Sequence, residues 1–580
     1  MTELLADLDP EQQAVATALD GPVIVLAGAG TGKTRAITHR IANAVTSGAH
    51  QADQTMAVTF TVRAAHEMKL RLQRLGIDGV SVRTLHASAL AMVQHFWPQA
   101  FGDQPPRVAE NAEAFLTQAM QRHHVPIEKP MIRDLSNEIS WTKAMRHSVQ
   151  NYSEVSSGRS ITAQIAATKI AEIMQTYDEL LSSSHQCDLS DIVLLAAALL
   201  EDQPRITRSF HDRYQHFTVD EFQDISPAQQ HLLNQWWGDR DSVCVVGDPG
   251  QAIYGFAGAN SSFLTQLEAR FPNATIAKLT RTYRSAPAIV HAANSFAEIP
   301  TVSQRNIVGK VEIKSAFDQR TEANEIATWI SQLIGSGLAA NEIAVLTRLN
   351  AQLPLIENAL RGIGITASTN SASGGVDLMT IHSAKGLEWK AVAIAGLSDQ
   401  LLPYQPFGIQ VEEAAIAEER RLFYVALTRA ADQVRISYTR DRGPSEFLSV
   451  ISADSGIDID TNTSTVTKAL VKADKEVLVI KPAKCRFCSK SLVTTTEKVS
   501  MRCDGCAPHV KLDLWQQLLN WRKSQAQLEE IPEFLILTDT TLRAIAECEG
   551  IGVAYQIGVS GITSIKLENY KADIDSLFSK

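Results

Sequence analysis

Residues 27–35 read AGAGTGKTR and directly follow the apolar run PVIVL (22–26). Glycines let the backbone curl so that several N–H groups point at phosphate oxygens, while Lys33 adds a point charge and Thr34 a hydroxyl for Mg²⁺. The strict pattern has Gly at its first position, where this chain has Ala27. A glycine-rich turn before a helix is the structural alternative, but the Lys-Thr offset and the apolar strand favour a polyphosphate loop. The predicted loop residues are Ala27, Gly28, Ala29, Gly30, Thr31, Gly32, Lys33 and Thr34.

A polyphosphate site also needs a second metal ligand and a base. The stretch HFTVDEFQD (216–224) reads as an apolar strand that ends in two adjacent carboxylates. In this position Asp220 can hold Mg²⁺ and Glu221 can polarise the attacking water. Taken alone, an Asp-Glu pair is more often a solvated strand end, so its meaning depends on the phosphate loop.

Length and composition describe an ordinary modular protein. The chain has 580 residues, a net charge of −10 and 45% hydrophobic residues, and its length predicts roughly four domains. The apolar stretch IVLLAAALL (192–200) is too short to span a bilayer, so we expect no membrane partner. The N-terminus resembles no signal peptide, and we therefore expect the seven cysteines to be reduced in the cytoplasm.

Hydrophobic periodicity divides the chain into regions. Short β-branched runs alternate with helical segments to about residue 440, which predicts a parallel α/β fold. Residues 89–200 instead show long helical stretches, as expected of a helical insertion. Residues 451–480 are rich in Ser, Thr and Asp in their first part and lack periodicity, so we expect a linker, followed by two small modules.

Several further motifs occur in a fixed order. They read TFTVRAAHEMKLRL (59–72), VRTLHASAL (82–90), VVGDPGQAIYGFAGA (245–259), LTRTYRS (279–285), VDLMTIHSAKGLEWKAV (376–392) and EERRLFYVALTRAA (418–431). Together with the phosphate loop, this series closely resembles the UvrD/Rep-type superfamily 1 (1A) DNA helicases over about residues 8–440.

The resemblance implies two RecA-like P-loop domains. The first comprises residues 1–88 and 201–278 and carries the helical insertion at 89–200; the second comprises residues 279–450. In the family, closure of the two domains on ATP completes the site, and hydrolysis releases it.

The resemblance also implies roles around the nucleotide. Gln12 matches the glutamine that reads the adenine edge, Tyr283 would stack on the base, and Arg35 lies beside it. Gln251 matches the residue that senses the γ-phosphate and the attacking water.

The second domain would supply the remaining charged groups. Arg284 and Arg429 match the two arginine fingers, whose guanidinium groups neutralise charge on the transferred phosphoryl. Glu388 matches a carboxylate near the ribose and triphosphate.

For the nucleic-acid strand, the family uses residues that match Thr59, Phe60, His86, Tyr254 and Phe256. Rings stacked on bases tolerate any sequence, which suits a motor that steps past all of them. A core position is the alternative for Phe60 and Phe256. Many relatives have Trp-Arg where this chain has Phe-Ala (256–257), and Asn where it has Thr282. We therefore expect a weaker grip on the strand with intact hydrolysis.

Most relatives insert a large helical subdomain between the motifs that correspond to 279–285 and 376–392. Here only 91 residues (285–375) separate Arg284 from Val376, and they read as α/β sequence. We expect this second insertion to be absent or vestigial, and hence ready translocation with poor unwinding unless another element or partner engages the duplex junction.

Two Cys-x-x-Cys pairs follow the linker. Cys485 and Cys488 are separated by 14 residues (489–502) from Cys503 and Cys506, which suits tetrahedral Zn²⁺ with a gap slightly below the usual range. A redox pair or free thiols are the alternatives. Residues 481–510 carry six Lys/Arg against two acidic residues, a net charge of +4. Of the two C-terminal modules, this zinc module is therefore the one better suited to bind phosphates.

Residues 511–580 resemble an HRDC domain, a small helical bundle at helicase C-termini. They carry seven basic and ten acidic residues, net −3, so docking to protein is at least as well supported as DNA binding. The combination of motor, four-cysteine module and HRDC domain is similar to a bacterial subgroup of UvrD-like helicases.

Together these features predict an ATP- and Mg²⁺-dependent motor on single-stranded DNA and single-strand/duplex junctions, with a structural Zn²⁺. The resemblance implies 3′→5′ movement, work in DNA repair or replication, a bacterial cytoplasmic location at the nucleoid, and partner proteins at the C-terminal modules. Two alternatives stay open: an RNA-directed superfamily 1 helicase, and a nucleotide-switched DNA-binding scaffold without processive movement. No cluster of carboxylates and lysine after Ala431 resembles a nuclease site.

Overall fold

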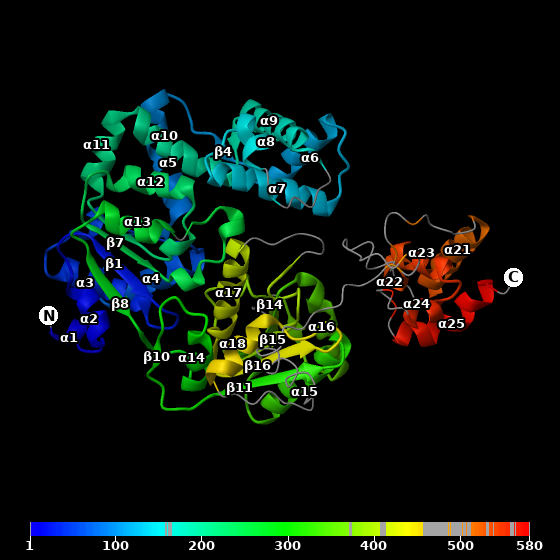
Figure 1. The fold of residues 1–580 in the computed structure, drawn as a ribbon. Helices are drawn as coiled ribbons and strands as arrows, with labels where there is room; N and C mark the ends of the chain where they lie inside the picture. The colour runs from blue at the N-terminus through cyan, green and yellow to red at the C-terminus, as the bar shows by residue number, and fades with distance from the viewer. Residues whose placement is uncertain are drawn as a thin grey trace. The chain divides into compact units, whose positions relative to one another are not determined.

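The fold is described from a computed structural model of the chain (Figure 1). The described residues are 2–156, 159, 165–260, 262–369, 374–405, 413–455, 485, 488, 502, 506, 512–528, 533–537, 539–556, 559, 562 and 564–578. Most of the predicted linker and zinc module, including Cys503, lies outside them. The chain forms two compact units, Met1–Asp460 and Thr461–Lys580.

The first lobe of the larger unit is built on a six-stranded parallel sheet with strand order β3-β2-β6-β7-β1-β8. The strands are β1 (Val23–Ala27), β2 (Thr55–Thr59), β3 (Ser81–Thr84), β6 (His216–Val219), β7 (Val243–Gly247) and β8 (Thr275–Leu279). Alternate residues of β1 enter different cores, Ile24 on one face and Val23 and Val25 on the other. The sheet is therefore covered on both faces, as parallel sheets require.

Helices cover the two faces of this sheet. On one face lie α2 (Pro10–Thr17), α3 (Lys33–Thr46) and α4 (Val62–Arg74), after the short α1 (Thr2–Leu5). On the other lie α5 (Leu85–Phe101), α10 (Leu189–Asp202), α11 (Pro204–Arg213), α12 (Pro227–Trp237) and α13 (Ser262–Arg270). The 3₁₀ turns of the lobe are η1 (Ala52–Gln54), η3 (Phe222–Asp224), η4 (Pro249–Gln251) and η5 (Gly255–Ala257).

A separate helical cluster projects from this lobe (Figure 1). It contains α6 (Ala112–Arg122), α7 (Lys129–Ala144), η2 (Val149–Asn151), α8 (Tyr152–Val155) and α9 (Ala167–Ser183), with its own core. A short parallel pair, β4 (Arg107–Val108) and β5 (Gln186–Cys187), marks where the chain leaves and returns.

The hydrophobic cores divide the predicted insertion at 89–200 differently from its sequence boundaries. Residues of α5 and α10, including Ala89 and Leu200, belong to the core of the sheet, because periodicity reveals a helix but not which core it joins. Lys143 of α7 fastens the cluster to α10, with its Nζ 2.7 Å from both Asp188 and Asp191.

The second lobe has another six-stranded parallel sheet, in the order β11-β16-β15-β12-β14-β13. The strands are β11 (Lys310–Ala316), β12 (Ile343–Thr347), β13 (Ala367–Ser368), β14 (Val376–Thr380), β15 (Trp389–Ala395) and β16 (Ala430–Thr439). A small pair, β9 (Arg281–Thr282) and β10 (Val302–Ser303), lies after β8 in the chain. Two parallel α/β lobes confirm the predicted fold class.

Helices again cover both faces. One face packs on α14 (Pro287–Asn294), α17 (Glu413–Leu427) and α18 (Glu446–Ser455), and the other on α15 (Gln319–Gly335) and α16 (Leu353–Gly362). The turns η6 (Ala340–Glu342) and η7 (Asn350–Gln352) flank β12. Because α18 ends at Ser455, the first five residues of the predicted linker (451–455) are helical.

The region between Arg284 and Val376 contains no inserted helical subdomain in its described parts, 285–369 and 374–375. These residues form β10, β11 and β12 with α14, α15 and α16, which are elements of the second lobe itself. The predicted reduction of the second insertion is therefore confirmed.

The smaller unit contains α21 (Leu512–Leu528), α22 (Glu533–Ile536), α23 (Asp539–Glu547), α24 (Ile551–Gln556) and α25 (Ser564–Phe578). They share one core that includes Leu518, Ile545 and Ile574, and Trp521 packs edge-on against Tyr570. Among the described residues of the chain, no helix has the length and apolar character needed to cross a membrane.

Candidate active site and nucleic-acid interface

The phosphate loop lies between β1 and α3, at the carboxyl edge of the first sheet. Gly30 and Gly32 adopt positive φ values of 72° and 80°, which glycine reaches at little cost. Space also excludes a side chain, since a Cβ on Gly30 would lie 2.5 Å from Thr282 Oγ1 and one on Gly32 would lie 2.6 Å from Gln12 Nε2. Ala27 is the last residue of β1, and Gly28, Ala29 and Thr31 complete the turn that follows it. Ala27 itself is buried in the sheet core, where a small side chain suffices.

Lys33 is a buried cation among carboxylates. Its Nζ lies 3.7 Å from Glu221 Oε2 and has no hydrogen-bond partner among the described residues. Burial lowers the pKa of Lys33, but Glu221, Asp248 and Asp220 together hold it above its ordinary value. The lysine therefore stays charged and aims into the loop, as phosphate binding requires.

The two strand-end carboxylates differ in environment. Thr34 Oγ1 donates to Asp220 Oδ2 at 3.4 Å, so the two groups assigned to Mg²⁺ lie side by side. Burial and the charge of Glu221 raise the pKa of Asp220. Burial also raises the pKa of Glu221, but Lys33 and Lys385 outweigh it and bring that pKa below its usual range. Glu221 is thus held as an anion.

Residues assigned to the adenine lie at the mouth of the loop. Gln12 is buried and donates through Nε2 to Thr31 O at 2.9 Å. Tyr283 is 46% exposed and donates its hydroxyl to Asp9 Oδ2 at 2.7 Å. Arg35 donates to Asp7 O at 2.9 Å. An exposed ring beside the loop leaves a face on which a base can stack.

The second lobe contributes two arginines to the same place. Arg429 is 1% exposed and donates to Gln251 Oε1 at 3.2 Å and to Leu387 O at 3.1 Å. Burial and the nearby Arg284 lower the pKa of Arg429, although a guanidinium remains charged at neutral pH. Arg284 donates through Nε to Glu388 Oε2 at 2.5 Å.

These groups surround one cavity of about 730 Å³ between the lobes. Its lining includes Gly30, Thr31, Gly32, Lys33, Thr34, Arg35, Asp220, Glu221, Gln251, Tyr283, Arg284, Glu388 and Arg429, and also Thr59, Phe60 and Tyr254. The volume falls within the 300–1,000 Å³ range typical of ligand pockets. Four residues assigned to the nucleotide are not among the lining residues: Gln12, Ala27, Gly28 and Ala29. The buried, unpartnered Lys33 Nζ and the adjacent Thr34 and Asp220 oxygens fit a triphosphate with Mg²⁺.

Two contacts between the lobes were not foreseen from the sequence. Ala29 N donates to the hydroxyl of Tyr424 on α17 at 3.2 Å. Lys385 Nζ lies 2.6 Å from Asp224 Oδ2, both side chains being nearly inaccessible to solvent. Each pair joins residues more than 150 positions apart, so no local sequence pattern predicts the contact. The only indication in the sequence is that Asp224, Lys385 and Tyr424 lie inside the recognised motifs.

The predicted strand-track residues form a row of rings across both lobes. Phe60 stacks on Tyr254 with centroids 5.5 Å apart, and Tyr254 meets Phe256 at 6.2 Å. Phe256 packs edge-on against His382 at 5.5 Å, which adds a residue that sequence reasoning missed. Phe60 and Phe256 are 40% and 57% exposed. This exposure favours a binding surface over the core position considered for Phe60.

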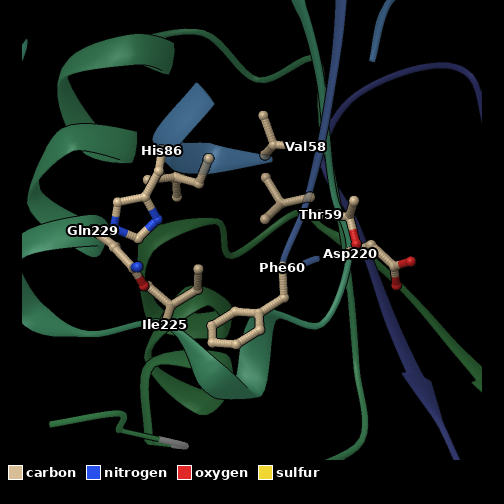
Figure 2. A pocket seen from close by; sticks show the side chains of 9 residues that line it. Val58, Thr59, Phe60, His86, Asp220, Ile225 and Gln229 are labelled. Carbon is tan, nitrogen blue, oxygen red and sulfur yellow. The ribbon is translucent and has the colours of Figure 1, made fainter. Parts of the chain in front are cut away.

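Thr59 and His86 line a smaller cavity of about 10 Å³ below Phe60. Figure 2 shows the His86 ring directed toward Gln229 and the Phe60 ring beside Ile225. The cavity holds at most about one water. Burial lowers the pKa of His86, so its ring is neutral at neutral pH.

The predicted zinc ligands lie in the smaller unit. The ligand atoms of Cys485, Cys488 and Cys506 lie within 4.8 Å of one another, and Cys485 Sγ is 3.9 Å from Cys506 Sγ. Tetrahedral zinc with Zn–S bonds of ~2.3 Å separates sulfurs by about 3.8 Å, so the donors fit this metal. Cys503 lies outside the described residues. Arg502 reaches from this module to Glu547 of α23, with Nε 3.2 Å from Oε2.

Comparison with protein families agrees with this architecture. The UvrD/REP helicase N-terminal domain matches residues 8–272, and the UvrD-like helicase C-terminal domain matches residues 277–373 and 366–441. The HRDC domain matches residues 511–574.

Curated relatives extend the match along the chain. The "ATP-dependent DNA helicase UvrD2" of Mycobacterium tuberculosis is 31% identical over 98% of both chains. The "ATP-dependent DNA helicase PcrA" of Bacillus subtilis is 28% identical over 63% of this chain and 50% of the relative. A "Probable DNA helicase" of Mycoplasma pneumoniae is 27% identical over 77% of this chain. The chain therefore belongs to the UvrD/Rep family of ATP-dependent DNA helicases.

Proposed function

We propose that this chain moves 3′→5′ along single-stranded DNA at the expense of ATP and separates duplexes at single-strand/duplex junctions during DNA repair or replication, in a bacterial cytoplasm at the nucleoid. One observation supports this proposal most directly. The charged cleft between the lobes opens beside a row of rings that crosses between the same lobes, and Phe60 and Phe256 of this row are exposed.

In this proposal the first lobe holds and activates the nucleotide. Lys33 and the loop amides bind the phosphates, and Thr34 and Asp220 hold Mg²⁺, which supplies charge neutralisation when bound. Glu221, held as an anion, accepts a proton from the attacking water. Gln251 faces both the phosphate loop region and Arg429, which suits a sensor of the γ-phosphate.

The second lobe completes the site. Arg429 is already directed at Gln251, whereas Arg284 is engaged with Glu388. Binding of ATP would draw Arg284 from Glu388 to the transferred phosphoryl, since a triphosphate is the stronger anion. Tyr283 and Gln12, with Arg35 beside them, hold the adenine. Because the arginines and the phosphate loop belong to different lobes, hydrolysis changes the attraction between the lobes.

The strand is held through stacking. Phe60, Tyr254 and Phe256 offer faces to successive bases, with Thr59 and His86 beneath them. Stacking carries no sequence information, so the grip tolerates any strand. The chain has Ala257 where many relatives have Arg, and hence this grip is weaker than theirs.

The smaller unit is assigned a supporting role. We assign the linker to residues 456–480, after the end of α18, the zinc module to 481–510 and the HRDC domain to 511–580. Cys485, Cys488, Cys503 and Cys506 would hold one structural Zn²⁺, which elemental analysis of the purified chain can check. The module's positive charge suits DNA and the acidic HRDC domain suits partner proteins.

Unwinding is expected to be weak in residues 1–450 alone, because the second lobe lacks the large insertion of its relatives. Robust unwinding of long duplexes by this fragment would contradict that part of the proposal.

The deciding experiment measures ATP hydrolysis with single-stranded DNA of increasing length, with Glu221→Gln as the blank and RNA of equal length as the comparison. Stimulation that grows with DNA length supports a translocating motor. Stimulation indifferent to length favours a nucleotide-switched scaffold, and stronger stimulation by RNA favours an RNA helicase. Duplexes with 3′ or 5′ tails then decide the direction.

A further inference from the structure

Helix α17 contacts the first lobe at both the nucleotide loop and the strand track. The Tyr424 hydroxyl accepts from Ala29 N in the phosphate loop. One carboxylate nearer the start of the helix, Glu418 Oε1, accepts from Gly255 N at 3.0 Å. The residues are six apart (424 − 418), which corresponds to about 9 Å along the helix axis. One rigid element therefore connects the two regions.

The contact at Glu418 is made to the backbone of a glycine, whose lack of a side chain lets the carboxylate come close. Burial raises the pKa of the Glu418 carboxyl overall, although the amide of Phe256 lies close enough to lower it. A Cβ on Gly255 would lie 2.6 Å from Glu418 Oε2, so any other residue would push the carboxylate away. A carboxylate that accepts from a backbone N–H at the start of a turn fixes the orientation of that turn in the way that a helix cap does.

The turn that Glu418 holds carries the rings of the track. Tyr254 precedes Gly255 and Phe256 follows it, so the carboxylate binds the first residue of η5, between the two rings in sequence. Phe256 is more than half exposed, and its ring touches only Tyr254 and His382 among the described aromatic residues. Its direction is therefore set by the backbone of the turn.

We infer that Glu418 is a positioning residue for single-stranded DNA: it orients the 254–257 turn so that Phe256 faces the bases, and it couples that orientation to the nucleotide loop through α17. A shift of α17 at Tyr424 displaces Glu418 as well, because both belong to one helix. The inference rests on the proposed function, since it assigns this residue to the same strand track.

The negative charge of Glu418 offers an alternative explanation for any effect of this residue on DNA binding. A carboxylate near a DNA path repels phosphate, so a residue that acted only through its charge would weaken binding in the native chain. Removing that charge by Glu418→Gln or Glu418→Ala would then tighten DNA binding in both variants. A positioning role predicts a different pattern, because Gln keeps an oxygen that accepts from the Gly255 amide and Ala does not.

The test uses the full chain, a fluorescein-labelled oligothymidylate and two readouts. Anisotropy gives the dissociation constant with ADP and with a non-hydrolysable ATP analogue, and hydrolysis gives the DNA concentration for half-maximal stimulation. Arg421→Ala is the matched control, since Arg421 lies on the same helix but pairs with Glu298 inside the second lobe.

In Glu418→Ala we expect the half-maximal DNA concentration to rise about tenfold, with the maximal rate held within about twofold. The difference in DNA affinity between the ADP and ATP-analogue states should also shrink. Glu418→Gln and Arg421→Ala should behave like the native chain.

Tighter binding in both Glu418 variants, or native binding by Glu418→Ala, would overturn the inference. Equal losses in Glu418→Gln and Glu418→Ala would do the same. A native chain whose hydrolysis ignores DNA would instead contradict the proposed function, so the two failures are distinguishable.

Discussion

The nucleotide cleft and the strand track lie side by side in the same pair of lobes but are built from opposite materials. The cleft is lined by buried charges such as Lys33, Glu221 and Arg429, which already neutralise one another across the lobes. The track is made of half-buried and exposed rings that touch one another and offer little charge. One region is organised by paired charges, and the other by aromatic surface.

This difference has an energetic consequence. Removing one member of a buried, paired set of charges leaves its partner uncompensated, which typically costs several kcal/mol. Removing one ring from a row loses only the stacking of that ring, ~1–3 kcal/mol. Substitutions in the cleft should therefore abolish activity singly, whereas substitutions in the track should weaken it gradually.

The largest effect is expected from Glu221→Gln. Loss of the base should reduce ATP hydrolysis by about a thousandfold, while the affinity for single-stranded DNA stays within about threefold, because no ring of the track is altered. Steady-state hydrolysis and anisotropy measure the two quantities. A parallel loss of DNA binding would show that the cleft and the track are not separable in this way.

The next effect tests the bridge between the regions. Lys385 donates to Asp224 and to Gln251 O, and its Nζ lies 5.0 Å from the centre of the Tyr254 ring. Lys385→Met leaves the buried Asp224 without its cation, so DNA-stimulated hydrolysis should fall by about ten- to a hundredfold.

Adding Asp224→Asn to Lys385→Met removes the orphaned charge as well. The double variant should therefore regain part of the lost rate, and a double-mutant cycle on hydrolysis measures that coupling. Additive losses would argue against a direct bridge between the two side chains.

The third effect concerns single rings. Phe60→Ala and Phe256→Ala should each raise the dissociation constant for oligothymidylate by about tenfold, with hydrolysis at saturating DNA largely retained. Phe101→Ala is the control, because Phe101 is also exposed but lies at the end of α5 against Trp97. Losses as severe as that of Glu221→Gln would remove the contrast between the two regions.

Sequence patterns predicted the parallel α/β fold, because β-branched runs and helical periods are local, whereas the division into two lobes was implied by the resemblance of the motifs. The motifs also predicted the helicase family and the set of residues that the structure gathers around one cavity. The roles of those residues remain proposals that the variants above address.

Other features could not be predicted from the sequence, for a physical reason. The pairs Lys385–Asp224 and Tyr424–Ala29 depend on how two lobes meet, which no local period records. The same holds for α5 and α10, which read as part of a helical insertion but bury their apolar faces on the first sheet. Local patterns determine elements, whereas the partner of each apolar face is decided by the whole fold.

The smallest effect on DNA binding is expected from a change of pH. It tests the contrast between the charged cleft and the uncharged track, because the track contains two histidines. Burial and then the charges of Arg348 and Lys385 lower the pKa of His382 to about 4, and burial lowers that of His86. A histidine whose pKa is lowered on folding stabilises the folded state. This stabilisation is complete above the ordinary pKa of about 6.5 and is lost as the pH falls through the lowered pKa of the folded state. Between pH 6.5 and 8 the His382 ring is therefore neutral, and burial favours the neutral form of His86. The affinity for oligothymidylate at constant ionic strength should vary by less than about twofold, and anisotropy across this range checks it.

A clear rise in affinity toward pH 6.5 that disappears in His382→Gln would mean that an imidazolium contacts phosphate, and the track would then share the electrostatic character of the cleft.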